Sequence, residues 1–350
     1  MSGWNFCSDN VAGASPEILQ ALSRAGAAGA MMPYGADPIS QKVEKHLAEL
    51  FETDLDVYFV ATGTAANSLA LSALCPPYGA VYCHPESHIN VDECNAPEFF
   101  TGGAKLITLD GADGKLDAGM LEAALGQGWA GVEHHAQPAA VSLTQVTEAG
   151  TVYRRDETAA IAEICRANGL GLHVDGARFA NALSTLGCSP AEATWRAGVD
   201  VLSFGATKNG ALAAEAVLFF RKGLAEGFRF RRKRAGHLVS KMRFVSAQLD
   251  AYLADGLWLA NASHANAMAA RLSDGLRDMA AVRFLYPVEA NELFVTLPAR
   301  VRDGLAAEGF AFYPWQAGGP DCVRLVTAFD TPVAAVDTFI ACARRHAGNA

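Results

Sequence analysis

Short runs rich in β-branched and aromatic residues alternate with longer segments of helical periodicity through the first two thirds of this chain. Because such alternation repeats a strand and a helix in turn, it indicates an α/β doubly wound sheet. We expect strands over residues 57–61, 105–109, 139–146, 170–174, 201–204 and 216–220, and helices over residues 67–74, 156–167 and 189–196.

The rhythm changes near residue 245. Two Ala/Leu-rich helices are expected there without a strand between them, over residues 244–259 and 262–279. Strands over 282–286, 292–297 and 322–327 then alternate with helices over 301–308 and 332–345. We interpret this as a large domain, residues 1–244 with its N-terminal segment, and a smaller C-terminal α+β domain, residues 245–350. The chain has 350 residues, 51% of them hydrophobic, which is enough for two such cores.

A lysine and an aspartate each follow an apolar run. Lys208 ends the run that begins at Val201 and is the only positive charge between Arg196 and Arg221, while Asp175 ends the run 170–174. Pyridoxal phosphate needs such a pair, since a lysine binds its aldehyde carbon and an acid keeps its pyridine nitrogen protonated. A surface lysine and a helix-capping aspartate are the alternative, but the two residues together with their flanking strands favour the cofactor.

A turn after the first strand could bind the phosphate of this cofactor. In Val60-Ala-Thr-Gly-Thr-Ala-Ala-Asn67 the amides of Gly63, Thr64 and Ala65 open a helix, and a helix N-terminus attracts a phosphate dianion. An ordinary capped helix start has the same sequence form.

Histidines are the next candidates. His84 and His88 are four residues apart, but Pro85 and the lack of a third ligand argue against zinc, so we expect no metal. His88 can stack on a pyridine ring and transfer protons, although a structural histidine would look the same. His134 and His135 precede the strand 139–146, and at most one of them would point toward the site; we favour His134.

Two single arginines lie in apolar surroundings. Arg178 follows the Asp175 strand, and Arg324 lies in the strand 322–327. An unpaired buried guanidinium is costly, so each requires either an internal carboxylate or the α-carboxylate of an amino-acid substrate.

Bulk properties exclude several classes of function. A net charge of −9 argues against nucleic acid as a partner, and the basic cluster over residues 229–243 is interpreted as a solvated helix face or, beside a phosphate cofactor, an anion-facing helix.

The sequence contains no uninterrupted apolar run of about 20 residues and no signal-like start, so we expect a cytoplasmic protein that does not bind membranes. The cysteines, without a C-x-x-C pair, are expected to be reduced.

Seven motifs together resemble the L-threonine aldolases, with His173-Val-Asp-Gly-Ala-Arg178 the most specific. The resemblance implies a pyridoxal-phosphate lyase of fold type I, with a mostly parallel, seven-stranded sheet in the large domain and a small C-terminal α+β domain. Such enzymes cleave β-hydroxy-α-amino acids, including threonine, allo-threonine and phenylserine, to glycine and an aldehyde. The motifs lie at residues 6–10, 34–38, 61–67, 87–88, 173–179, 207–208 and 323–327.

The resemblance also implies roles for individual residues and a homo-oligomer, commonly a tetramer. Deprotonation of the substrate's β-hydroxyl through His88, or a water that it holds, would select cleavage of the Cα–Cβ bond. The implied roles are Lys208 in the Schiff base, Asp175 at the pyridine nitrogen, Gly63, Thr64 and Ala65 at the phosphate, His88 on the ring, Ser8, Arg178 and Arg324 at the substrate carboxylate, and Tyr34 from a neighbouring subunit.

Two alternatives have different consequences. A β-eliminating lyase or an aminotransferase would use Lys208 to remove the Cα proton. A non-enzymatic scaffold would have no reason to retain buried charges of this kind.

Overall fold

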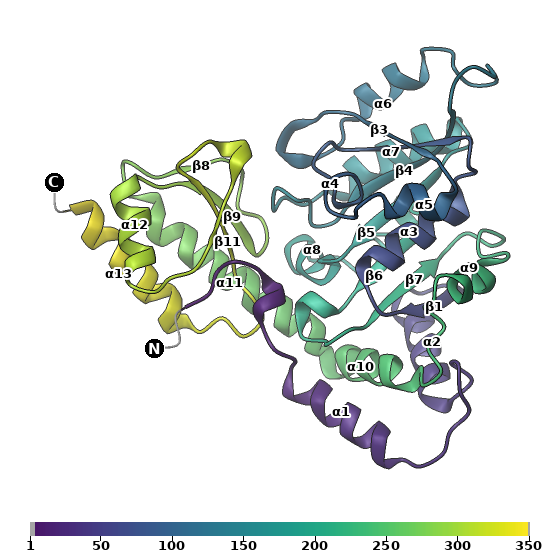
Figure 1. Ribbon diagram of the computed structural model, residues 1–350, viewed down its shortest axis with the longest axis horizontal. Helices are drawn as coiled ribbons and strands as arrows, with labels where there is room; N and C mark the ends of the chain where they lie inside the picture. Colours follow the sequence, from purple (N-terminus) through teal and green to yellow (C-terminus); the bar gives the residue numbers. More distant parts are fainter. Residues whose placement is uncertain (1–3, 349–350) are drawn as a thin grey trace.

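A seven-stranded sheet forms the centre of the larger lobe in the computed structural model, which describes residues 4–348 (Figure 1). Strand β7 is antiparallel to its neighbours β1 and β6, while the pairs from β6 through β5, β4 and β2 to β3 are parallel. The expected α/β class with a mostly parallel sheet is therefore confirmed. In spatial order the strands are β1 (Asp56–Val60), β7 (Glu215–Phe219), β6 (Val201–Gly205), β5 (Gly171–Gly176), β4 (Gln137–Thr144), β2 (Gly79–Cys83) and β3 (Lys105–Thr108).

Helices cover both faces of this sheet because neighbouring strand residues point to opposite sides. Leu202 of β6 packs in the core shared with one group of helices, whereas Val201 packs in the core under the other group. The first group is α1 (Pro16–Ala27), α2 (Pro38–Leu50), α6 (Ala118–Leu125), α7 (Arg155–Ala167), α8 (Phe179–Leu186) and α10 (Arg243–Leu253). The second comprises α3 (Gly63–Leu74) and α9 (Phe228–Arg234), and the short helices α4 (His88–Val91) and α5 (Ala96–Thr101) lie near α3.

Two sequence expectations differ from the structure. No strand was expected over β2, a five-residue run that follows Pro76 and Pro77 and is buried throughout. The helix expected over residues 189–196 was wrong, because the segment forms turns and a short 3₁₀ helix, Trp195–Ala197. There Ser189 and Glu192 form a reciprocal cap, with the Ser189 N–H donating to Oε2 of Glu192 at 3.0 Å, but no regular α-helix follows it.

The smaller lobe contains a four-stranded antiparallel sheet packed against helices α11 (Leu257–Arg277), α12 (Ala299–Ala307) and α13 (Val333–Gly348). Its core includes Phe6, so the N-terminal segment belongs to this lobe. A backbone bridge joins Asn5 to Ala311, and Val326 N–H donates to Phe6 O at 2.9 Å. In spatial order the strands are β10 (Tyr313–Pro314), β11 (Cys322–Val326), β9 (Glu292–Thr296) and β8 (Arg283–Phe284).

Helix α11 connects the two hydrophobic cores. Ala262, near its start, packs in the core of the large lobe, whereas Met268 packs in the core of the small lobe. Helix α10 also packs on the large lobe, through Val245 and Leu249. The domain boundary expected at residue 245 stays a prediction, since both cores share α11. Within residues 4–348, none of the helices has the length and apolar character needed to cross a membrane.

Candidate active site

A cavity of about 340 Å³ opens at the carboxyl ends of strands β1, β4, β5 and β6. Crevices at this edge of an open α/β sheet are the usual ligand sites of such folds. The predicted residues Gly63, Thr64, His88, Asp175, Arg178 and Lys208 all line the cavity.

Asp175, in the penultimate position of β5, is buried and held by two donors. Its Oδ2 accepts a hydrogen bond from Asn67 Nδ2 at 2.7 Å, and its Oδ1 accepts from the Ala177 N–H at 2.9 Å. The next residue has to be glycine, since a Cβ on Gly176 would lie 2.6 Å from the carbonyl oxygen of Ser203. These two hydrogen bonds fix the orientation of the Asp175 side chain.

Lys208 lies in a short 3₁₀ turn, Thr207–Asn209, directly after β6. The turn is fixed by Asn209, whose buried Nδ2 donates to Tyr252 Oη and to the Trp258 carbonyl, both at 2.8 Å. Gly210 has a φ of +112°, and a Cβ there would lie 2.3 Å from Ser15 Oγ. These contacts hold the backbone of Lys208 at the mouth of the sheet.

Glu215, at the start of β7, faces the same turn. Its Oε1 accepts the Thr207 N–H at 3.4 Å, and it lines the cavity beside Lys208. Burial raises the pKa of Glu215 to about 7, against the opposing effects of Thr207 and the Lys208 charge.

Two backbone amides at the start of α3 are available for an anion. Thr62 caps the helix by accepting the Ala65 N–H at 3.2 Å on its Oγ1, so that amide is already bonded. Among the described residues, the amides of Gly63 and Thr64 have no acceptor. The expected phosphate turn therefore presents two free amides at the positive end of a 12-residue helix, and not the three that the sequence suggested.

His88 begins α4 and lies in a network of acids. Its Nδ1 is 2.8 Å from Oε1 of Glu93, whose side chain is fully buried, and Asn67 Nδ2 donates to the same oxygen at 2.8 Å. The hydrogen bond to Glu93 raises the pKa of His88. His84 does not share this site, because its Nε2 lies 3.3 Å from the Gly111 carbonyl oxygen.

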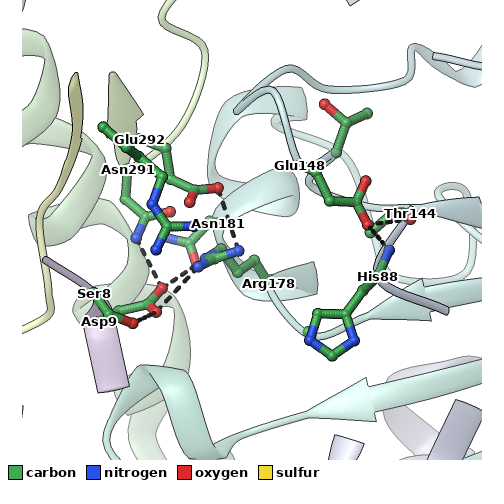
Figure 2. A network of polar contacts seen from close by, with 12 residues as sticks. Ser8, Asp9, His88, Thr144, Glu148, Arg178, Asn181, Asn291 and Glu292 are labelled. Atoms are coloured by element: carbon green, nitrogen blue, oxygen red, sulfur yellow. Dashed lines mark hydrogen bonds and ion pairs between the residues drawn. The ribbon is translucent and has the colours of Figure 1, made fainter. Parts of the chain in front are cut away.

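Arg178 forms ion pairs with two internal carboxylates (Figure 2). Its Nε and Nη2 donate to Asp9 at 2.6 and 3.1 Å, and its Nη1 lies 3.2 Å from Oε2 of Glu292. Burial acts to raise the pKa of Asp9, but Arg178 and Lys208 oppose it, and the net result is a lowered pKa. Arg178 thus joins the N-terminal segment and the small lobe to the cavity wall.

Arg324 and Ser8 lie beside the cavity lining and not in it. Arg324, on β11, donates from Nη2 to the Cys7 carbonyl oxygen at 3.2 Å and lies over the ring of Tyr313. Its buried Nε has no partner among the described residues. Ser8 accepts the N–H of Asn10, which does line the cavity, at 3.1 Å.

His134 and Tyr34 do not reach the cavity of their own chain. His134 is exposed in the loop before β4, which places it at the amino end of that strand and at the opposite edge of the sheet. This corrects the expectation that it approaches the site from a strand end. Tyr34 is half exposed, with the Lys233 ammonium 5.6 Å from its ring centroid.

Sequence reasoning missed several polar residues of the site, notably Glu148. Its Oε1 accepts the His88 N–H at 2.7 Å and the Thr144 hydroxyl at 3.0 Å. Burial, and then the charge of Asp175, raise the pKa of Glu148 to about 7. The available signal was the position of Thr144 and Glu148 at the end of an apolar strand, the same signal that identified Asp175. The other missed residues are Asn67, Glu93, Thr144 and Glu215.

Comparison with known proteins places this geometry in a family. The profile of the β-eliminating lyases matches residues 5–299. A low specificity L-threonine aldolase from Pseudomonas sp. strain NCIMB 10558 is 46% identical over 95% of this chain and 94% of the relative. The chain belongs to the threonine aldolases of the β-eliminating lyase family. A threonine aldolase structure from Leishmania major agrees with a TM-score of 0.92 at 30% identity, covering 98% of this chain and 99% of that one. A low specificity L-threonine aldolase from Pseudomonas aeruginosa is 46% identical over 94% of this chain and 93% of its own length.

Members of this family depend on pyridoxal phosphate, and the cavity fits that group. A lysine, a buried and hydrogen-bonded carboxyl group and two helix-start amides line it, and these match an aldehyde, a pyridine nitrogen and a phosphate. Its volume of about 340 Å³ lies within the range of cofactor sites.

Proposed function

We propose that this threonine aldolase uses pyridoxal phosphate to cleave L-threonine, L-allo-threonine and related β-hydroxy-α-amino acids such as phenylserine. The products are glycine and an aldehyde. One observation carries the proposal: Lys208, Asp175 and the free amides of Gly63 and Thr64 surround a single cavity in a chain of this family.

The large lobe holds the cofactor. Lys208 would bind its aldehyde carbon, Asp175 would pair with its pyridine nitrogen, and the start of α3 would bind its phosphate. When bound, the cofactor supplies an electron sink for the substrate's α-carbon. Asn67 and the Ala177 N–H orient the Asp175 carboxylate, which would form an ionic hydrogen bond to the pyridine nitrogen.

His88 would stack on the ring of the bound cofactor. Its Nδ1 is bonded to Glu93, which holds the imidazole at the cavity wall.

The substrate's carboxylate binds on the small-lobe side. Arg324 has an unpartnered buried Nε within the described residues, and Ser8 lies in the adjacent N-terminal segment. Arg178 completes this wall while its own charge is balanced by Asp9 and Glu292.

A homo-oligomer follows from the same proposal, with Tyr34 contributed to a neighbouring subunit's site. Tyr34 is half exposed and its backbone is held by a hydrogen bond from its N–H to the Ser240 carbonyl at 3.0 Å. Sedimentation of the purified protein tests the oligomer. A monomer that is fully active would contradict the role of Tyr34.

The activity is tested by incubating the cofactor-loaded protein with threonine and measuring glycine and acetaldehyde. Equal amounts of both are expected. Ammonia with 2-oxobutanoate would indicate β-elimination instead, and dependence on an added 2-oxo acid would indicate amino transfer. Lys208→Ala is the control, because it removes the residue that binds the cofactor.

A further inference from the structure

Glu148 has an unused carboxyl oxygen at the active-site cavity. Two hydrogen bonds, from the His88 N–H and the Thr144 hydroxyl, both end on Oε1 (Figure 2). The second oxygen, Oε2, is buried and has no partner among the described residues. Since a buried polar atom without a partner costs stability, it indicates a place where a ligand completes the bonding.

The cavity contains a second candidate for proton transfer, His88, but its geometry is less suitable for a base. Glu93 accepts a hydrogen bond from Nδ1 and thereby raises the pKa of the imidazole. A raised pKa favours the protonated ring, which donates protons and does not accept them. The backbone N–H of His88 donates to Glu148, so the side chains of these two residues lie on one wall of the cavity.

The surroundings of Glu148 adjust its proton affinity to neutral pH. Burial and the charge of Asp175 raise its pKa to about 7, while the hydrogen bonds from His88 and Thr144 oppose that shift. Its other charged or titratable neighbours are Arg178, Tyr153 and Cys83, whose own pKa values respond to its charge. A base with a pKa near the working pH is both populated and strong enough to take a proton.

We propose that Oε2 of Glu148 accepts the β-hydroxyl proton of the substrate during Cα–Cβ cleavage, an inference that rests on the proposed aldolase function. The O–H bond breaks and the proton passes to Oε2. The electron pair of that bond becomes the second C–O bond of the aldehyde, while the pair of the Cα–Cβ bond remains on the α-carbon. Protonation of the α-carbon then yields glycine, so no oxidant or reductant is required.

Thr144 acts as a positioning residue in this arrangement. Its hydroxyl donates to Oε1 at 3.0 Å, which fixes the orientation of the carboxyl group and leaves Oε2 unbonded among the described residues. Thr144→Val is expected to lower the cleavage rate by about tenfold and to leave the Glu148 ionisation visible in the pH profile.

The decisive experiment compares the cofactor-loaded wild type with Glu148→Gln. The matched control is Glu289→Gln, because Glu289 also accepts a backbone N–H, that of Val152 at 2.7 Å, yet lies outside the cavity. Three quantities are measured: threonine cleavage against pH, exchange of the glycine α-proton in deuterated water, and the dissociation constant of pyridoxal phosphate. Glycine has no β-hydroxyl, so its proton exchange does not need the proposed step.

We expect Glu148→Gln to reduce kcat for threonine by about 10²–10⁴-fold and to lose the ionisation near neutral pH. Glycine exchange and the cofactor dissociation constant should stay within about threefold of wild type, as should all properties of Glu289→Gln. Equal losses of cleavage and exchange would mean that Glu148 supports the site structurally, and full cleavage in the variant would also overturn the proposal.

Two further results keep this inference separable from the proposed function. A wild type that releases no glycine from threonine contradicts the aldolase function itself, whatever the variant does. If Glu148→Gln does not fold, Glu148→Asp retains a carboxyl but shortens its reach. We then expect the acidic side of the pH profile of threonine cleavage to shift and kcat to fall, while glycine exchange stays normal. An unchanged kcat and an unchanged pH profile would overturn the proposal.

Discussion

Arg178 and Asp9 form a buried ion pair across 169 positions of the chain, with Nε 2.6 Å from Oδ2. The pair joins the residue after the Asp175 strand to the N-terminal segment, whose Phe6 packs in the small lobe. It therefore connects the cavity wall of the large lobe with the small lobe.

Removing the Arg178 guanidinium should destabilise the protein. Arg178→Ala leaves Asp9 and Glu292 buried without their counter-ion, so we expect the free energy of unfolding to fall by about 3–5 kcal/mol. Urea denaturation measures this. Arg271→Ala is the control, since its pair with Asp337 is half exposed and should contribute less than about 1 kcal/mol. Equal effects in both variants would contradict the structural role.

Arg324 is expected to behave differently. Its guanidinium has a free Nε and one bond to a backbone carbonyl, so Arg324→Ala should mainly raise KM for threonine, by about 10- to 100-fold. The dissociation constant of pyridoxal phosphate should not change. An unchanged KM would make Arg324 a structural partner of the N-terminal segment only.

Lys208→Ala should abolish the adduct that borohydride traps between the protein and pyridoxal phosphate, because Lys208 is the lysine that lines the cavity. Peptide mapping locates the adduct in the wild type. Lys233→Ala, which changes the basic helix α9, serves as the control and should retain the adduct. A label on Lys233 or Lys241 would falsify the assignment.

Asp175→Asn should preserve the fold and lower kcat by about 10²-fold or more, because the neutral amide no longer holds the pyridine nitrogen protonated. Steady-state kinetics on the cofactor-saturated variant measures the loss. Near-normal turnover would remove Asp175 from the mechanism.

Glu215 should make the cofactor-free protein less stable as pH rises. Burial raises its pKa from 4.5 to about 7, so the folded state holds a proton that the unfolded state has released between these values. Stability from this group is present below about pH 4.5 and is lost on rising through about pH 7, by up to about 3 kcal/mol. Glu215→Gln should thus gain stability over wild type between about pH 5 and about pH 8 in urea titrations. A constant difference across this range would show that Glu215 does not titrate in the folded protein.

The sequence predicted those parts of the site that follow apolar strands. Asp175 and Lys208 each end such a run, and the parallel strands bring them to one edge. Glu93 and Asn67 escaped notice, because they meet Asp175 and His88 only after α3 and the turn following α4 have packed together. His134 was misplaced because it precedes its strand instead of following it.

The fold, like the site, was predictable where local sequence patterns indicate it and not where it depends on tertiary packing. Apolar runs indicated β4 and β5, whereas β2 begins two residues after Pro76 and Pro77, and such a pair of prolines is typical of a loop. The pairing of Asn5 with Ala311 has no sequence signature, since it depends on where the small lobe places residue 311.

The contacts of Asp9 also bear on the order in which the protein matures during translation. Asn291 donates to Oδ2 of Asp9 at 3.1 Å and lies 282 positions further along the chain. A ribosome adds these residues in sequence, so the Asp9 carboxylate lacks its bond from Asn291 until well after the strands of the large sheet have been made. A nascent chain that already contains the whole seven-stranded sheet still lacks the contacts that Asn291 and Glu292 make with Asp9 and Arg178. Maturation of the catalytic centre is thus a late event in biosynthesis.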